Sequence, residues 1–236
     1  MIASKTQRLL VAGMTAGLMT ASLSAIAQTA AAPAQTGTNR AAPAATAAAQ
    51  SPVESIRMAH SLIRYGDQNK DPHALITAAR ILQATGSSAF RGERAGGTAG
   101  AAKAATDPRS VPALLQRAKA MANNRADIVA AADDVANQGN RGRVEGPARS
   151  RSVVNTRASD TYRVNFRGGE RAVVLVSGDG DSDLDLFVYD QNGNLICKDD
   201  DETDDMVCSW TPRWTGQFRV EIKNLGIANE YVIATN

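Results

Sequence analysis

The sequence predicts an α+β protein whose two kinds of secondary structure occupy separate regions: small α-helical hairpins come first, and an antiparallel, jelly-roll-like β-sandwich follows. Two observations carry this prediction. Up to about residue 139, apolar residues recur every three or four positions, which is the period of an amphipathic helix. After about residue 151, apolar and polar residues alternate in short runs separated by turn residues, which is typical of a sandwich.

The first 27 residues have the pattern of a signal peptide. Lys5 and Arg8 precede an uncharged, mostly apolar stretch, and Ala-Ile-Ala at 25–27 matches a cleavage site. A transmembrane anchor is the alternative, but the stretch is short and rich in Ala, Gly, Thr and Ser. No later segment is long and apolar enough to span a bilayer. We therefore expect a periplasmic or secreted protein whose mature chain begins at Gln28.

Three segments have the composition of linkers or loops. Residues 28–51 are almost only Ala, Pro, Thr, Gln and Ser and predict a disordered linker. Residues 87–106 are rich in Gly, Ala and Ser and predict a flexible loop. Residues 140–151 are basic and contain glycine, so we expect a second linker there. The helical region then spans 52–139.

Helix-start signals divide this helical region into two hairpins. Ser51 and Asp71 each precede a proline, the arrangement of an N-cap with proline at the first helical position. Gly86 ends the second helix. Ser110 begins a third helix, and Asn124 precedes a fourth. Because the apolar faces are rich in alanine, we expect a thin core that gains stability by docking on the next domain.

Seven runs beyond the second linker have the composition of short strands. They cover residues 162–166, 171–177, 184–188, 195–198, 206–210, 217–223 and 231–235. Asn192-Gly193 is a hairpin-turn signal between two of them. We expect about eight antiparallel strands that form a sandwich over 152–236.

Five segments of this C-terminal region carry a family resemblance, the first being the run Tyr162 to Phe166. The others are GDGDSDLDLFVYDQNGN at 178–194, DDDETDD at 199–205, SWTPRWTGQFRVEIKN at 209–224 and the closing NEYVIATN. In this order they resemble the bacterial pre-peptidase C-terminal domain, over about residues 150–236. The resemblance implies a small β-sandwich of the kind appended to secreted peptidases and found in other exported proteins. No catalytic domain precedes it in this chain, so it implies no activity.

The formal net charge of +2 hides an asymmetry between the two halves. Residues 28–158 hold 17 Lys and Arg against 9 Asp and Glu, whereas 159–236 hold 7 against 15, giving +8 and −8. Either the two surfaces are solvated independently, or the basic helices dock on the acidic sandwich. A nucleic-acid partner is not expected, because the basic half is exported, poor in aromatics and without a tight basic cluster.

Cys197 and Cys208 are the only cysteines of the chain. In an oxidising compartment such a pair favours a disulfide over two buried free thiols. Both lie on predicted strands that flank the acidic segment 199–205. If those strands pair as a hairpin, the bond clamps the base of the acidic loop.

Acidic residues crowd two predicted turns. The run at 179–183 begins like an EF-hand, but Leu184 stands where the glycine belongs and Asp190 where the glutamate belongs, which excludes that motif. A different calcium site is an alternative, since calcium takes several close oxygen ligands. Its candidate ligands are Asp179, Asp181, Asp183, Asp199, Asp201 and Asp204. The other explanation is solvated turns that keep strand edges from pairing.

Trp214 is the candidate for stacking on a ligand, because an exposed tryptophan can cover a sugar or a peptide. The alternative is that it packs under the turn that follows Trp210. Catalysis by Ser, His and Asp is not indicated, because His60 and His73 both lie in the helical region and no G-x-S-x-G occurs.

These observations predict an exported, non-catalytic binding or structural module of the bacterial envelope that needs no cofactor. Its partner would be a protein or a glycan. A calcium-stabilised accessory domain is one alternative, and a hydrolase whose site the fold assembles from unsuspected residues is the other.

Overall fold

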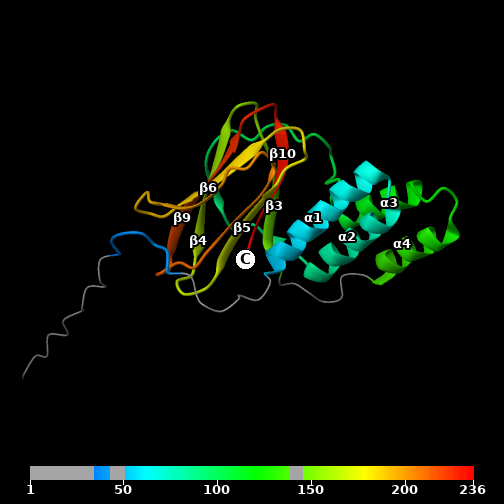
Figure 1. The fold of residues 1–236 in the computed structure, drawn as a ribbon, viewed down its shortest axis with the longest axis horizontal. Helices are drawn as coiled ribbons and strands as arrows, with labels where there is room; N and C mark the ends of the chain where they lie inside the picture. Colours follow the sequence, from blue (N-terminus) through cyan, green and yellow to red (C-terminus); the bar gives the residue numbers. More distant parts are fainter. Residues whose placement is uncertain (1–34, 43–50, 139–145) are drawn as a thin grey trace, which may run out of the picture. The chain divides into compact units, whose positions relative to one another are not determined.

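The computed structural model describes residues 35–42, 51–138 and 146–236. Within these ranges the fold is α+β, as predicted: four helices in the N-terminal half are followed by two antiparallel-rich sheets that form a sandwich (Figure 1). The predicted signal peptide lies outside the described residues. Gln35–Asn236 is one compact unit, so helices and sandwich are described together.

The first three helices begin where the N-cap signals place them, whereas the fourth begins at Ala126, one residue beyond the position after Asn124. In the described part of the chain they are α1 (Pro52–Asn69), α2 (Pro72–Thr85), α3 (Val111–Ala120) and α4 (Ala126–Gln138). The Ser51 hydroxyl accepts a hydrogen bond from the Val53 amide, and the Ser51 amide donates to Glu54. Asp71 caps α2 in the same way. Helix α1 ends at Asn69. Lys70, whose backbone is in the left-handed conformation, makes the turn and is followed directly by Asp71, the N-cap of α2.

The described strands form two sheets of five. They are β1 (Ser88–Ala89), β2 (Glu93–Gly96), β3 (Ala148–Val154), β4 (Ser159–Phe166), β5 (Ala172–Ser177), β6 (Leu184–Tyr189), β7 (Leu195–Asp199), β8 (Asp205–Trp210), β9 (Gly216–Asn224) and β10 (Asn229–Thr235). Sheet A has the order β1-β3-β10-β5-β8, and sheet B has the order β2-β4-β9-β6-β7. The seven runs named above correspond to β4–β10. All strand pairs are antiparallel except β1 with β3.

Two segments that the composition predicts as loop or linker form strands. Residues 87–106 contain β1 and β2, which add one edge strand to each sheet. Strand β3 begins at Ala148, inside the predicted linker 140–151. An edge strand is held by backbone hydrogen bonds and needs few apolar side chains, so its composition does not reveal it.

Arg94 on β2 connects the two sheets. Its Nη2 lies 2.9 Å from the Tyr162 hydroxyl, and its guanidinium contacts the buried Asp160 carboxylate of β4 and the Ser152 hydroxyl of β3. The Tyr231 hydroxyl donates to the second oxygen of Asp160 at 2.6 Å. Burial by itself would lower the pKa of Arg94, but the contacts with Asp160 outweigh it and raise the pKa. The segment expected to be flexible therefore supplies the counter-charge of a core carboxylate.

Strand β5 is buried on both faces. Val174 and Val176 lie in the core between the sheets, whereas Val173 and Leu175 belong to a second core built mainly from α1–α4. Ala234 of β10 joins the second core. The helices therefore cover the outer face of sheet A (Figure 1).

Ion pairs accompany this apolar contact. Arg64 of α1 donates to Asp205 of β8 with Nη2 and Oδ2 2.7 Å apart, and Lys103 Nζ lies 2.6 Å from Asp179 Oδ2. In both pairs a cation of the basic half meets a carboxylate of the acidic half. The docking that the charge asymmetry suggested is thus present within one chain, and buried apolar residues contribute to it as well.

Replacing Arg94 with methionine tests its role in the core. The substitution keeps the length of the side chain but leaves the buried Asp160 without its cation, so we expect a loss of about 3 kcal/mol in the free energy of unfolding. Urea denaturation followed by circular dichroism measures the loss. Exposed Arg91 is the matched control, and its methionine variant should change stability by less than about 0.5 kcal/mol. Equal losses in the two variants would contradict this role.

Candidate functional site

The register of sheet B collects aromatic and cationic side chains on its outer face. Residues paired directly across antiparallel strands point to the same face. Arg219 pairs with Tyr189, Glu221 with Phe187, and Lys223 with Asp185. We call this surface the aromatic face and define it by Arg163, Asp185, Phe187, Tyr189, Lys198, Arg219, Glu221 and Lys223. The alternate residues of the same strands fill the core between the sheets.

Two half-buried rings lie at the centre of the aromatic face. Phe187 and Tyr189 are two residues apart on β6, and their ring centroids are 6.5 Å apart with the planes 23° from parallel. The Arg219 guanidinium lies 4.0 Å from the Tyr189 centroid, and Lys223 Nζ lies 4.4 Å from that of Phe187. Each ring therefore has a cation over it, a contact that is favourable in its own right.

The aromatic face is cationic on a domain that is otherwise acidic. Four Lys and Arg stand on it against two carboxylates, Asp185 and Glu221, whereas residues 159–236 carry −8 overall. The pKa of Asp185 is raised, first by burial and then by the carboxylates of Asp183 and Asp200. Glu221 accepts a hydrogen bond from Arg219 at 2.7 Å. This surface offers rings and cations to a partner that carries hydroxyl or carboxylate groups.

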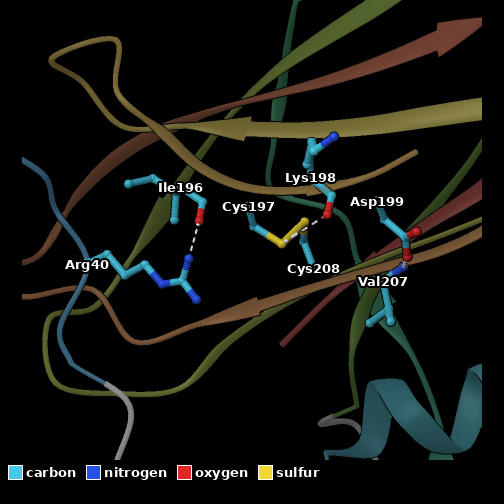
Figure 2. The surroundings of a disulfide bond; sticks show 7 residues. All are labelled: Arg40, Ile196, Cys197, Lys198, Asp199, Val207 and Cys208. Atoms are coloured by element: carbon cyan, nitrogen blue, oxygen red, sulfur yellow. Dashed lines mark hydrogen bonds between the residues drawn. A yellow bond between two sulfur atoms is a disulfide. The ribbon is translucent and has the colours of Figure 1, made fainter. Parts of the chain in front are cut away.

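The predicted disulfide between Cys197 and Cys208 is present, but the strands that carry it do not form a hairpin. Strand β7 is an edge of sheet B, and β8 is an edge of sheet A, so the bond joins the two sheets (Figure 2). The Asp199 carboxylate on β7 also accepts a hydrogen bond from the Val207 amide on β8 at 2.8 Å. The acidic residues 200–204 thus connect the two sheets.

Part of the predicted disordered linker is held against the sandwich. Asn39 is fully buried; its amide donates to Asp190 at 2.8 Å, and its side chain bonds to both backbone polar atoms of Trp214. Arg40 donates to the Ile196 carbonyl on β7 at 2.7 Å (Figure 2). Burial would raise the pKa of Asp190, but its hydrogen bonds together lower it. The Thr-Asn-Arg sequence at 38–40, which interrupts the Ala/Pro composition, is the signal that could have identified this segment.

The side chain of Trp214 is half-buried, so its ring is only partly exposed for stacking on a ligand. The Arg213 guanidinium lies 5.6 Å from the centroid of its ring, and Asn39 fixes its backbone. Trp210 is a core residue, packed against Phe166 and Phe218. Ligand stacking by Trp214 stays a prediction.

The six candidate calcium ligands are spread over different protein contacts. Five of them have donors: Lys103 for Asp179 and Asp181, Gly180 for Asp204, Val207 for Asp199, and Thr203 for Asp201. The pKa of Asp183 is raised by burial and by Asp201, Glu202 and Asp204. Within the described ranges, no three His, Cys, Asp or Glu side chains gather as metal ligands. Calcium binding remains a prediction from the sequence.

Comparison with known proteins returned solved structures only; neither a family model nor a curated protein matches the chain. A mitogen derived from Yersinia pseudotuberculosis is 12% identical over 39% of this chain and 86% of its own, with a TM-score of 0.33. The pre-peptidase C-terminal domain of a Bacillus anthracis collagenase is 8% identical over 38% and 89%, with a TM-score of 0.32. The Aeromonas hydrophila periplasmic inhibitor of g-type lysozyme is 11% identical over 38% and 86%, with a TM-score of 0.29. At these identities the similarity concerns the β-sandwich fold alone.

No helix among residues 35–42, 51–138 and 146–236 has both the length and the apolar character of a membrane span.

Reduction of the disulfide should lower the free energy of unfolding by about 3 kcal/mol, because the bond closes a short loop in the unfolded chain. Urea denaturation with and without reductant measures this difference. A Cys197→Ser, Cys208→Ser double variant is the control, and it should match the reduced protein in both buffers. Thiol labelling of the unfolded, unreduced protein would contradict the bond.

Calcium binding to the folded chain would raise the midpoint of thermal unfolding in proportion to the logarithm of the calcium concentration. The measurement is a melting series up to millimolar calcium, with magnesium as the control ion. If the candidate ligands bind calcium, Asp181→Asn should reduce the rise. An unchanged midpoint would contradict the calcium prediction.

Proposed function

We propose that this chain is an exported, non-catalytic binding module of the bacterial envelope, and that the aromatic face holds its partner, a protein or a glycan. The observation that carries the proposal is the pair Phe187 and Tyr189 on an outer sheet face. Such a face is normally polar, so paired rings among cations are unexpected there. The other outer face, that of sheet A, is occupied by the helices.

The chemistry of the aromatic face suits both kinds of partner. Aromatic rings stack on sugar rings, and Tyr, Phe and Arg are enriched at the centres of protein interfaces. The cations Arg219 and Lys223 can turn from the rings to a carboxylate or hydroxyl of the partner. A Cys197–Cys208 disulfide fits an oxidising compartment and so supports export.

Two of the groups with shifted pKa values have structural roles, which is consistent with a non-catalytic module. The pKa of the Arg94 guanidinium is raised and that of the Glu230 carboxyl is lowered. Glu230 accepts a hydrogen bond from Arg151, and the contacts of both groups hold structural elements together. On this proposal residues 152–236 act as a domain of the pre-peptidase C-terminal kind, to which β1 and β2 have been added. The sequence motifs quoted above support that relationship.

Removing both rings of the aromatic face should weaken partner binding without unfolding the protein. We expect Phe187→Ala with Tyr189→Ala to weaken binding by at least about tenfold, since truncating central aromatic anchors typically costs 2 kcal/mol or more. Co-sedimentation with purified cell-wall glycan and cross-linking to envelope proteins measure the two partner classes separately.

The control is Tyr65→Ala, an exposed aromatic on α1 outside the aromatic face. It should bind like the wild type, and thermal unfolding of both variants verifies the fold. Unchanged binding by the double variant would overturn the role of this face. Turnover of the bound glycan would overturn the non-catalytic assignment.

A further inference from the structure

Residues 38–41 contact the sandwich without joining either of its sheets. Within this segment Asn39 is fully buried, whereas Thr38 and Arg40 are exposed and Ala41 is half-buried. The hydrogen bonds of Asn39 and Arg40 go to residues at least 151 positions later in the sequence. Since the segment buries no large apolar side chain, it is held as a protein holds a short bound peptide.

The Asn39 side chain lies in a pocket at the end of β6 and before β9. We call it the Asn39 pocket and define it by Asp190, Gln191, Arg213, Trp214 and Gly216. Asn39 Oδ1 accepts from the Arg213 and Trp214 amides at 2.9 and 3.1 Å, and Nδ2 donates to the Trp214 carbonyl at 3.0 Å. The Asn39 amide donates to Asp190 at 2.8 Å. A side chain with both an acceptor and a donor is needed here, which a carboxamide provides.

Gly216 leaves the space that the carboxamide occupies. A Cβ added at this position would lie 3.4 Å from Asn39 Nδ2 and 3.1 Å from Gln191 Oε1. The second distance is shorter than nearly all real contacts of a Cβ. A side chain at position 216 would therefore crowd the pocket, and the pocket is closely fitted to asparagine.

The walls of the Asn39 pocket are held by bonds that do not involve residues 38–41. Asp190 Oδ1 accepts from the amides of Asn192 and Asn194, both at 2.9 Å, across the Asn-Gly turn. In the loop that carries Trp214, the Pro212 carbonyl accepts from the Gly169 amide at 2.8 Å. Because the pocket is preformed, binding a peptide costs it little conformational freedom.

Arg40 and Ala41 continue the contact beyond the Asn39 pocket. Arg40 Nη1 donates to the Ile196 carbonyl on edge strand β7 at 2.7 Å (Figure 2). The Ala41 amide donates to the Thr211 carbonyl at 2.7 Å. Ala41 is thus bound through its backbone, whereas Asn39 and Arg40 are bound through their side chains. The contacts are specific for asparagine followed by arginine.

We propose that the Asn39 pocket is a recognition site for a peptide in which asparagine is followed by arginine, and that it takes residues 38–41 from the same chain or from a second copy. The segment is held by a few hydrogen bonds, so its release exposes little apolar surface and costs little hydrophobic free energy. Exchange between copies would then link them through a contact that already exists within one chain. The site does not depend on the partner of the aromatic face.

The probe is a synthetic peptide of residues 35–42, QTGTNRAA, with blocked ends and a fluorescent label. Asn39→Ala in the purified chain removes the side chain that fills the pocket, so this variant should bind the peptide saturably. The wild type should bind it at least about tenfold more weakly, because its own covalently attached segment competes. Fluorescence anisotropy measures the affinity, and the amide resonances of Arg213 and Trp214 locate the bound peptide.

Matched controls separate recognition from non-specific binding. A peptide with Asn39→Asp has the same shape but places a carboxylate oxygen against the Trp214 carbonyl, so it should bind at least about tenfold more weakly. Asn69→Ala changes an exposed asparagine at the end of α1, and this chain should behave like the wild type. Adding Gly216→Val to the Asn39→Ala chain should weaken binding by about tenfold or more, because the new side chain occupies the pocket.

Thermal unfolding verifies the fold of each variant. If Asn39→Ala does not fold, Arg40→Ala tests the same point at an exposed position: its segment lacks the bond to Ile196, so the chain should bind the peptide more tightly than the wild type does.

Three results would overturn the proposal. They are the absence of saturable binding to the variants with a weakened segment, equal affinity of these variants and the wild type, and equal affinity for the asparagine and aspartate peptides. Failure of the glycan or protein experiment with the aromatic face would leave these results unaffected, so the two proposals fail separately.

Discussion

Strand β5 is apolar on both of its faces, and this constraint determines how the rest of the described chain is layered. Val174 and Val176 require a second sheet on one side, and Val173 and Leu175 require another apolar layer on the other. The buried residues of the four helices form one core with this face of sheet A, so the shared layer contributes to both regions. The resulting order is helices, sheet A, sheet B.

This layering explains where binding surfaces can form. The helices pack against the outer face of sheet A, the aromatic face lies on the outer side of sheet B, and polar groups between the helices and sheet A line a cavity. Arg109 and His60 lie at that boundary because the helices approach β5 where the strand ends and its carbonyls become available. The position of the cavity therefore follows from that of β5.

The sequence predicted the elements with strong local signals. Ser51 and Asp71 mark helix starts, and β5 is an uninterrupted apolar run, because caps and buried strands depend on the residue types at those positions. Asn39, Arg94 and the edge strands β1 and β2 escaped prediction, because their partners lie far away in sequence and their neighbours are Gly and Ala. The cysteine pairing was predictable, but the sheets it joins were not, since strand order depends on long-range register. The aromatic face was missed for the same reason.

A disulfide and a group of hydrogen bonds join the two sheets of the sandwich. The Cys197–Cys208 bond joins the edge strands β7 and β8, and on the other side of the sandwich Arg94 of edge strand β2 bonds to Ser152 of β3 in sheet A. The two sheets are therefore held together on both sides, by a covalent bond between β7 and β8 and by hydrogen bonds between β2 and β3. Because β2 lies between α2 and α3 in the chain, loss of the Arg94 contacts would release the segment that joins two helices as well as the edge strand of sheet B.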